Sequence, residues 1–70
     1  MYHITYVKEM RVKVIFTAAE GIQLNAWDNG TLDDIIESAA SIMKTHNFQL
    51  AEIIDRVTDE LLVSIEGPDL

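Results

Sequence analysis

Apolar and polar residues alternate along the first sixteen residues of the chain. The even-numbered positions are apolar except for Lys8: Tyr2, Ile4, Tyr6, Met10, Val12, Val14 and Phe16. A period of two is typical of a β-strand with one buried face. A two-residue hairpin at Lys8 and Glu9 would mix the two faces, and a three-residue loop there would lack Gly or Asn. We therefore predict one strand over 2–17, bent or bulged near Lys8 and Glu9, whose first half extends beyond its own sheet.

A turn and a second strand are expected next. The segment 18–21 ends in Gly21, which suits the left-handed position of a bulged hairpin. The even-numbered apolar face then continues through Ile22, Leu24 and Ala26. This pattern predicts a strand over 22–27, and Asp28-Asn29-Gly30 is typical of a turn that ends it.

A helix is predicted to begin at Thr31. Thr31 is a good N-cap, and Asp34 follows at the spacing of a capping box. Apolar residues and one histidine then recur at helical spacing on one face: Leu32, Ile35, Ile36, Ala39, Ile42, Met43 and His46. Asn47 can adopt the left-handed conformation that ends a helix.

The stretch LAEIIDRVTDELLVSI, residues 50–65, fits either a helix or a hairpin. The weak helix formers at 57–59 favour the hairpin, with strands over 49–56 and 61–66 and with Asp59 in the left-handed conformation. The expected cross-strand pairs are Arg56 with Glu60, Ile54 with Leu62, Ile53 with Val63 and Ala51 with Ile65. Both faces of such a hairpin are apolar, and one helix cannot cover both.

These elements together predict the α+β fold class. We expect a small antiparallel sheet of about four strands, in chain order β-β-α-β-β, with one helix packed on one face. Residues 1–70 would form a single domain, and 67–70 a frayed tail.

The charge of the chain is strongly acidic and unevenly distributed. Its formal net charge is −7, from five basic and twelve acidic residues, and three of the basic residues lie at 8–13. Such a surface repels phosphate backbones, so we expect no direct nucleic-acid binding, but it attracts basic protein surfaces. The acidity alone also fits a role in solubility. The charged residues at 8–13 interrupt any signal peptide, and the longest apolar runs are too short for a membrane span, so we expect a cytoplasmic protein.

The residues that could carry chemistry are few and dispersed. His3 and His46 are the only histidines, and no nucleophile elbow surrounds Ser38, Ser41 or Ser64. A chain of this size has little room for a ligand pocket of about 300 Å³ or more. We expect no enzymatic activity, catalytic residue, cofactor or metal site.

In its small size, its acidity and its lack of cysteine, the chain resembles phage-encoded inhibitors of host defence, such as anti-CRISPR proteins and nucleic-acid mimics. The resemblance implies an inhibitor that engages a basic site on a nucleic-acid-handling protein in the host cytoplasm, and it assigns no residue roles. We therefore predict a non-enzymatic protein-binding module. The expected contact residues are Glu52, Asp55, Asp59, Glu60, Leu50, Ile54 and Leu62.

The alternative is a homodimeric structural or accessory protein with no inhibitory role. A homodimer is also expected beside the first function, because the exposed sheet surface would complete its own core. The expected self-association residues are Tyr2, Ile4 and Tyr6 of the overlong first strand.

Overall fold

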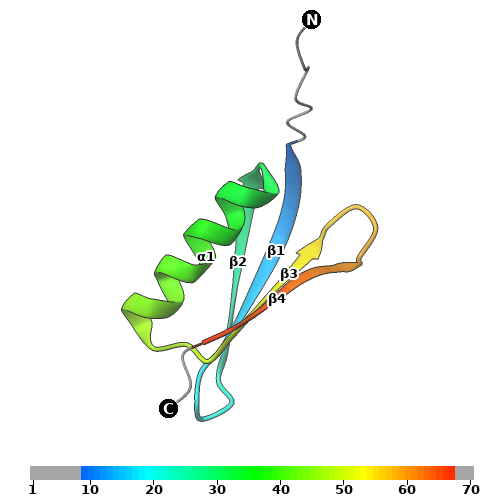
Figure 1. Ribbon diagram of the computed structural model, residues 1–70. Helices are drawn as coiled ribbons and strands as arrows, with labels where there is room; N and C mark the ends of the chain where they lie inside the picture. Colours follow the sequence, from blue (N-terminus) through cyan, green and yellow to red (C-terminus); the bar gives the residue numbers. More distant parts are fainter. Residues whose placement is uncertain (1–8, 68–70) are drawn as a thin grey trace, which may run out of the picture.

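The structure is a computed structural model, and it describes residues 9–67. The elements are β1 (Met10–Thr17), β2 (Gln23–Gly30), α1 (Leu32–His46), β3 (Leu50–Asp55) and β4 (Leu61–Glu66). The four strands form one antiparallel sheet in the order β2-β1-β3-β4, and α1 packs on one face of it (Figure 1). The predicted fold class and chain order are confirmed.

The core lies between α1 and the face of the sheet that carries the even-numbered side chains of β1. Val14 has Ala26 opposite it on β2 and Ile53 opposite it on β3, so three strands contribute to one apolar layer. The fully buried residues are Val12, Val14, Phe16, Ala51 and Ile53 from the sheet, and Ile35, Ala39 and Met43 from the helix. Burying a side chain such as Phe16 stabilises the fold by about 1.5–3 kcal/mol.

Both ends of α1 are capped as predicted. The Thr31 hydroxyl oxygen accepts a hydrogen bond of 3.2 Å from the backbone N–H of Asp34. At the other end Asn47 has φ 59°, and its backbone N–H donates to the Met43 carbonyl. The ring of Phe48 then stacks on Phe16 with 5.1 Å between centroids. The chain leaving the helix is therefore attached to the core.

The predicted end of the second strand is wrong, although its beginning is close. Gly21 has φ 86°, as expected for the hairpin turn before it. The residues 28–30, however, are not a turn: β2 continues to Gly30, which lies opposite Met10. The pairing of these three residues with β1 stabilises the extended conformation more than their intrinsic preference stabilises a turn. The chain instead reverses at Gly30, whose φ of 147° favours glycine, directly before the helix cap.

The expected burial of the apolar residues around β2 is also only partly correct. Ala26 packs against the core, but Ile22 is 67% exposed and Leu24 is 54% exposed. Leu24 lies on an edge strand, where a neighbouring strand shields only one side. Two large apolar side chains therefore remain on the surface at this edge.

The hairpin of β3 and β4 is confirmed, and it contains a β-bulge. Ile53 lies opposite Val63 and Ala51 opposite Ile65, as predicted. The register then shifts by one residue, so that Ile54 lies opposite Leu61 instead of Leu62.

The bulge makes two expectations wrong: that Leu62 lies on the contact surface, and that Arg56 pairs with Glu60. Leu62, the extra residue, packs against the core. Arg56 does not pair with Glu60 in the ladder, because it lies in the turn, where its backbone N–H donates to the Arg11 carbonyl. Asp59 does take the left-handed conformation, with φ 65°.

Several expectations fall outside the described residues. They concern the first half of the long strand, the bend near Lys8 and the residues beyond Gly67. Gly67 itself was expected in a frayed tail, but its N–H donates a 2.8 Å hydrogen bond to the Gln49 carbonyl. Within 9–67, α1 is neither long nor apolar enough to cross a membrane.

Ile35 is the helix residue whose truncation should cost most. Its side chain is only 1% exposed to solvent where it packs in the core, so Ile35→Ala removes buried methyl groups and leaves a cavity. We expect the free energy of unfolding to fall by about 2–5 kcal/mol in urea denaturation followed by circular dichroism. The control Ile22→Ala, at a position 67% exposed, should cost less than about 0.5 kcal/mol. Equal effects of the two substitutions would contradict the placement of the helix.

Candidate protein-binding surfaces

The face of the sheet opposite α1 carries no second layer within the described residues (Figure 1). The strand register assigns the side chains of this face, which we call the open face. They are Arg11, Lys13, Ile15, Thr17, Gln23, Asn25, Trp27, Asn29, Leu50, Glu52, Ile54, Leu61, Ser64 and Glu66. Antiparallel sheets often expose one face to water, and that face is then mostly polar.

Much of the open face is apolar. Trp27 is 63% exposed and Leu61 is 55% exposed, while Ile15, Leu50 and Ile54 are half-buried. Three of these five lie in one row across the sheet, together with Lys13: Trp27, Lys13, Ile54 and Leu61. Apolar side chains gathered on one face of a sheet indicate a contact surface more strongly than exposed residues scattered singly do.

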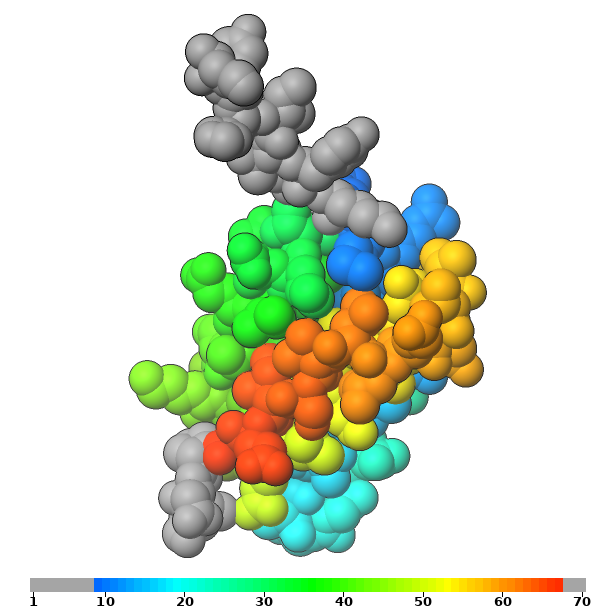
Figure 2. Space-filling model, turned by 45° about the vertical axis from the view of Figure 1, so that its right-hand side comes forward, coloured from blue at the N-terminus to red at the C-terminus, as the bar shows by residue number. Residues whose placement is uncertain are grey.

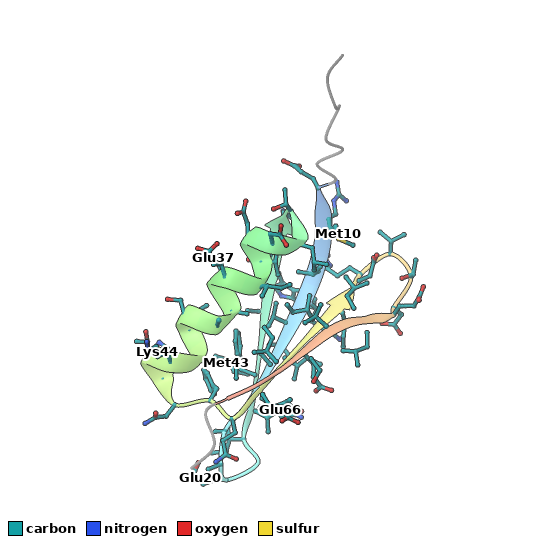
Figure 3. The ribbon with its side chains drawn as sticks, viewed as in Figure 1. Met10, Glu20, Glu37, Met43, Lys44 and Glu66 are labelled. Carbon is teal, nitrogen blue, oxygen red and sulfur yellow. The ribbon has the colours of Figure 1, made fainter. Side chains whose placement is uncertain are left out.

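Charges on the open face are separated along the strands. Arg11, Lys13 and Arg56 lie toward the start of β1, and the guanidinium carbon of Arg56 is 4.9 Å from the centroid of the Trp27 ring. The acids Glu52 and Glu66 lie toward the other end of the face, and Figure 3 shows Glu66 on the side of the sheet away from α1. Two of the four Lys and Arg residues in the described part of the chain are thus on this face, and a third, Arg56, lies over its Trp27 ring.

The turn between β3 and β4 forms a second surface. The Asp55 carboxylate accepts hydrogen bonds from the backbone N–H groups of Val57, at 2.7 Å, and Thr58, at 3.4 Å. The Asp59 N–H donates to the Asp55 carbonyl at 2.7 Å. These bonds fix the turn, and the side chain of Val57 remains 81% exposed at its tip. In Figure 2, β4 runs along the surface away from this turn.

The topology brings acids from distant parts of the sequence to the same end of the molecule. The start of β1, the end of β2, the first turn of α1 and the β3–β4 turn all lie at this end, which we call the acidic end (Figure 1). Its carboxylates are Glu9, Asp28, Asp33, Asp34, Asp55, Asp59 and Glu60. Lys44 and His46 lie in the last turn of α1, at its other end, and Figure 3 shows Lys44 there. Seven carboxylates thus gather at the acidic end, which also holds the three cations Arg11, Lys13 and Arg56 on the side of the open face.

The residues predicted to bind a partner divide between these surfaces. Asp55, Asp59 and Glu60 lie in the turn, and Leu50, Glu52 and Ile54 lie on the open face. Leu62 faces the core, so we exclude it from the contact surface. The predicted self-association residues Tyr2, Ile4 and Tyr6 are outside the described part of the chain.

On the open face and the β3–β4 turn, sequence reasoning missed three exposed apolar side chains: Trp27, Val57 and Leu61. For Trp27 the signal was available, because its odd number puts it on the face opposite Val12 and Val14. For Leu61 it was not, because the bulge reverses the side on which Leu61 and Leu62 lie. Val57 was assigned to the loop without a role.

The surface also contains grooves, and one is larger than expected for a chain of this size. It has a volume of about 560 Å³ and lies between the β1–β2 turn and the end of α1. Its lining includes Glu20, Lys44, His46 and Phe48. A smaller groove of about 240 Å³ lies between α1 and β2. Over residues 9–67, no three acidic or histidine side chains gather as a metal site.

Comparisons with protein-family models, with curated proteins and with solved structures give no match for this chain.

The shape of the β3–β4 turn should depend on the Asp55 oxygen rather than on its charge. Asp55→Ala removes the acceptor for Val57 and Thr58, whereas Asp55→Asn keeps one. We expect Asp55→Ala to lower the free energy of unfolding by about 0.5–1.5 kcal/mol and Asp55→Asn to lower it less. Urea denaturation of the two variants beside the parent measures this. A larger loss of unfolding free energy for Asp55→Asn than for Asp55→Ala would contradict the role of the Asp55 oxygen as the acceptor that holds the turn.

Proposed function

We propose that the protein is a non-enzymatic protein-binding module whose β3–β4 turn engages a basic site on a nucleic-acid-handling protein. The observation that carries this proposal is a turn fixed by its own hydrogen bonds that exposes Val57 beside Asp59 and Glu60. A phage-type inhibitor of host defence, such as an anti-CRISPR protein, is the specific form of this function that fits a small, acidic chain. It would act in the cytoplasm. If a phage encodes the chain, this is the cytoplasm of the host cell.

Preorganisation supports a binding role for this turn. A loop that must be ordered on binding loses conformational entropy at that moment, and this cost reduces affinity. The Asp55 carboxylate already orders the backbone at Val57 and Thr58 in the free protein. Val57 contributes little to the core, because it is 81% exposed, so its apolar side chain is free to enter a pocket on a partner.

Charge supports a basic partner. Asp59 and Glu60 follow the exposed Val57 in the turn, Arg56 is the one cation beside them, and the other carboxylates of the acidic end extend the negative field. Sites that bind nucleic-acid phosphates are rich in Lys and Arg, so they complement this field. Opposite charges mainly speed association and select the partner, while apolar contacts supply much of the affinity.

Paired variants with equal charge change test this proposal. The turn variant carries both Asp59→Asn and Glu60→Gln. The control variant carries both Glu20→Gln and Glu37→Gln, at exposed positions away from the turn. Each double variant and the parent are immobilised, and the proteins captured from a lysate of the native host cell are quantified by mass spectrometry. A basic, nucleic-acid-handling protein should be captured by the parent and by the control, and much less by the turn variant.

Binding kinetics with the purified partner then separate charge from apolar contact. Neutralising Asp59 and Glu60 should lower the association rate constant several-fold at low salt, and the difference should shrink as salt screens the charges. Val57→Ser should instead raise the dissociation rate constant, because it removes an apolar contact. Kinetics that respond to neither salt nor these substitutions would assign the acids to solubility and contradict the proposal.

A further inference from the structure

We propose that two copies of the chain pack their open faces against each other, with a two-fold axis that runs across the strands. This homodimer uses a different surface from the β3–β4 turn, so it stands independently of the proposed function. The described part of the chain offers no second layer of its own for this face.

The apolar side chains of the open face favour a protein occupant. Trp27, Ile54 and Leu61 lie in one row, and Ile15 and Leu50 lie in the rows below. Trp27 and Leu61 are more than half exposed, so both remain in contact with water in the single chain. Sheets that pack face to face bury such alternating residues between layers about 10 Å apart.

The charges identify the occupant as a second copy. The open face carries cations in its first two rows, at Arg11 and Lys13, with Arg56 beside them. It carries anions in its last two rows, at Glu52 and Glu66. A surface with both signs at opposite ends is complementary to itself when it is turned end over end.

This separation of charge also selects the symmetry. A two-fold axis along the strands would put the rows of Arg11 and Lys13 against the same rows of the other copy, so that cations would lie level with cations. An axis across the strands, between the rows of Lys13 and Ile15, brings Lys13 level with the partner's Glu52. The same axis brings Arg11 level with the partner's Glu66. An isologous interface of this kind closes at two copies.

The size of the face predicts a weak dimer. Four strands about 4.8 Å apart and six to eight residues long, at about 3.3 Å per residue, make a small contact area. Protein–protein interfaces of small area are often transient, so we expect a dissociation constant of the dimer in the micromolar range. The two acidic ends would lie at opposite ends of the dimer, and both β3–β4 turns would stay accessible.

A single-stranded nucleic acid is the competing occupant for this face. Exposed Trp27 and three nearby cations could stack a base and bind its phosphates. Glu52, however, lies on the neighbouring strand one row beyond Lys13, so a phosphate backbone that ran along the face from Lys13 would pass close to its carboxylate. A second copy uses this carboxylate, whereas a nucleic acid is repelled by it.

Charge exchange tests the dimer. The parent, Lys13→Glu, Glu52→Lys and the double variant are studied by sedimentation equilibrium over a range of concentrations, after circular dichroism has shown that each is folded. Each single variant should weaken the dimer by about 10-fold or more, because like charges then face each other. The double variant should recover the parent dissociation constant within about threefold. Glu66→Lys, at an exposed strand end, gives a second test if a central variant fails to fold.

Mixing the two single variants gives the decisive result. Lys13→Glu and Glu52→Lys should form a heterodimer with each other, because both contacts are then between opposite charges, although each alone is monomeric. A parent that remains a 7.9 kDa monomer up to about 1 mM would overturn the inference. A mixture that remains monomeric would overturn it as well. Binding of a fluorescent single-stranded oligonucleotide that Trp27→Ala abolishes, with a monomeric parent, would assign the face to nucleic acid instead.

Discussion

A single helix can cover only one face of a four-stranded sheet, and the rest of this molecule follows from that constraint. The cap at Thr31 and the stop at Asn47 fix where α1 begins and ends, and Ile35, Ala39 and Met43 fix the face that it buries. Figure 3 shows Met43 directed toward the sheet, whereas Glu37 and Lys44 point away from it. Within residues 9–67 no other element covers the opposite face, so its side chains are left to meet water or a partner.

Strand direction determines how charge is distributed over these surfaces. Because neighbouring strands are antiparallel, the end of β2, the start of α1 and the β3–β4 turn meet at one end, and their acids accumulate there. The open face differs from the rest of the molecule, because it holds Arg11 and Lys13 and has Arg56 over its Trp27 ring. Two surfaces of different character are thus available: an acidic end with a fixed turn, and an amphipathic face with both signs of charge.

Most of the fold could be predicted from local patterns, and the contact surfaces could not. The alternation around Val12 and Val14 and the caps at Thr31 and Asn47 are local signals, and each proved correct. The bulge after Ile53 has no local signal, because it depends on how β3 and β4 pair, and it exchanges the environments of Leu61 and Leu62. The contact of Arg56 with Trp27 joins residues from a turn and an edge strand, so spacing along the chain does not indicate it.

The central claim is that α1 covers the even-numbered face and leaves Trp27 in water among cations. Trp27 is the only tryptophan, so its fluorescence reports on this face alone. In dilute protein, iodide should quench Trp27 more strongly than caesium does, relative to free tryptophan, because Lys13 and Arg56 attract anions locally although the chain carries a net charge of −7. Stronger quenching by caesium, or emission shielded from both ions, would contradict the account.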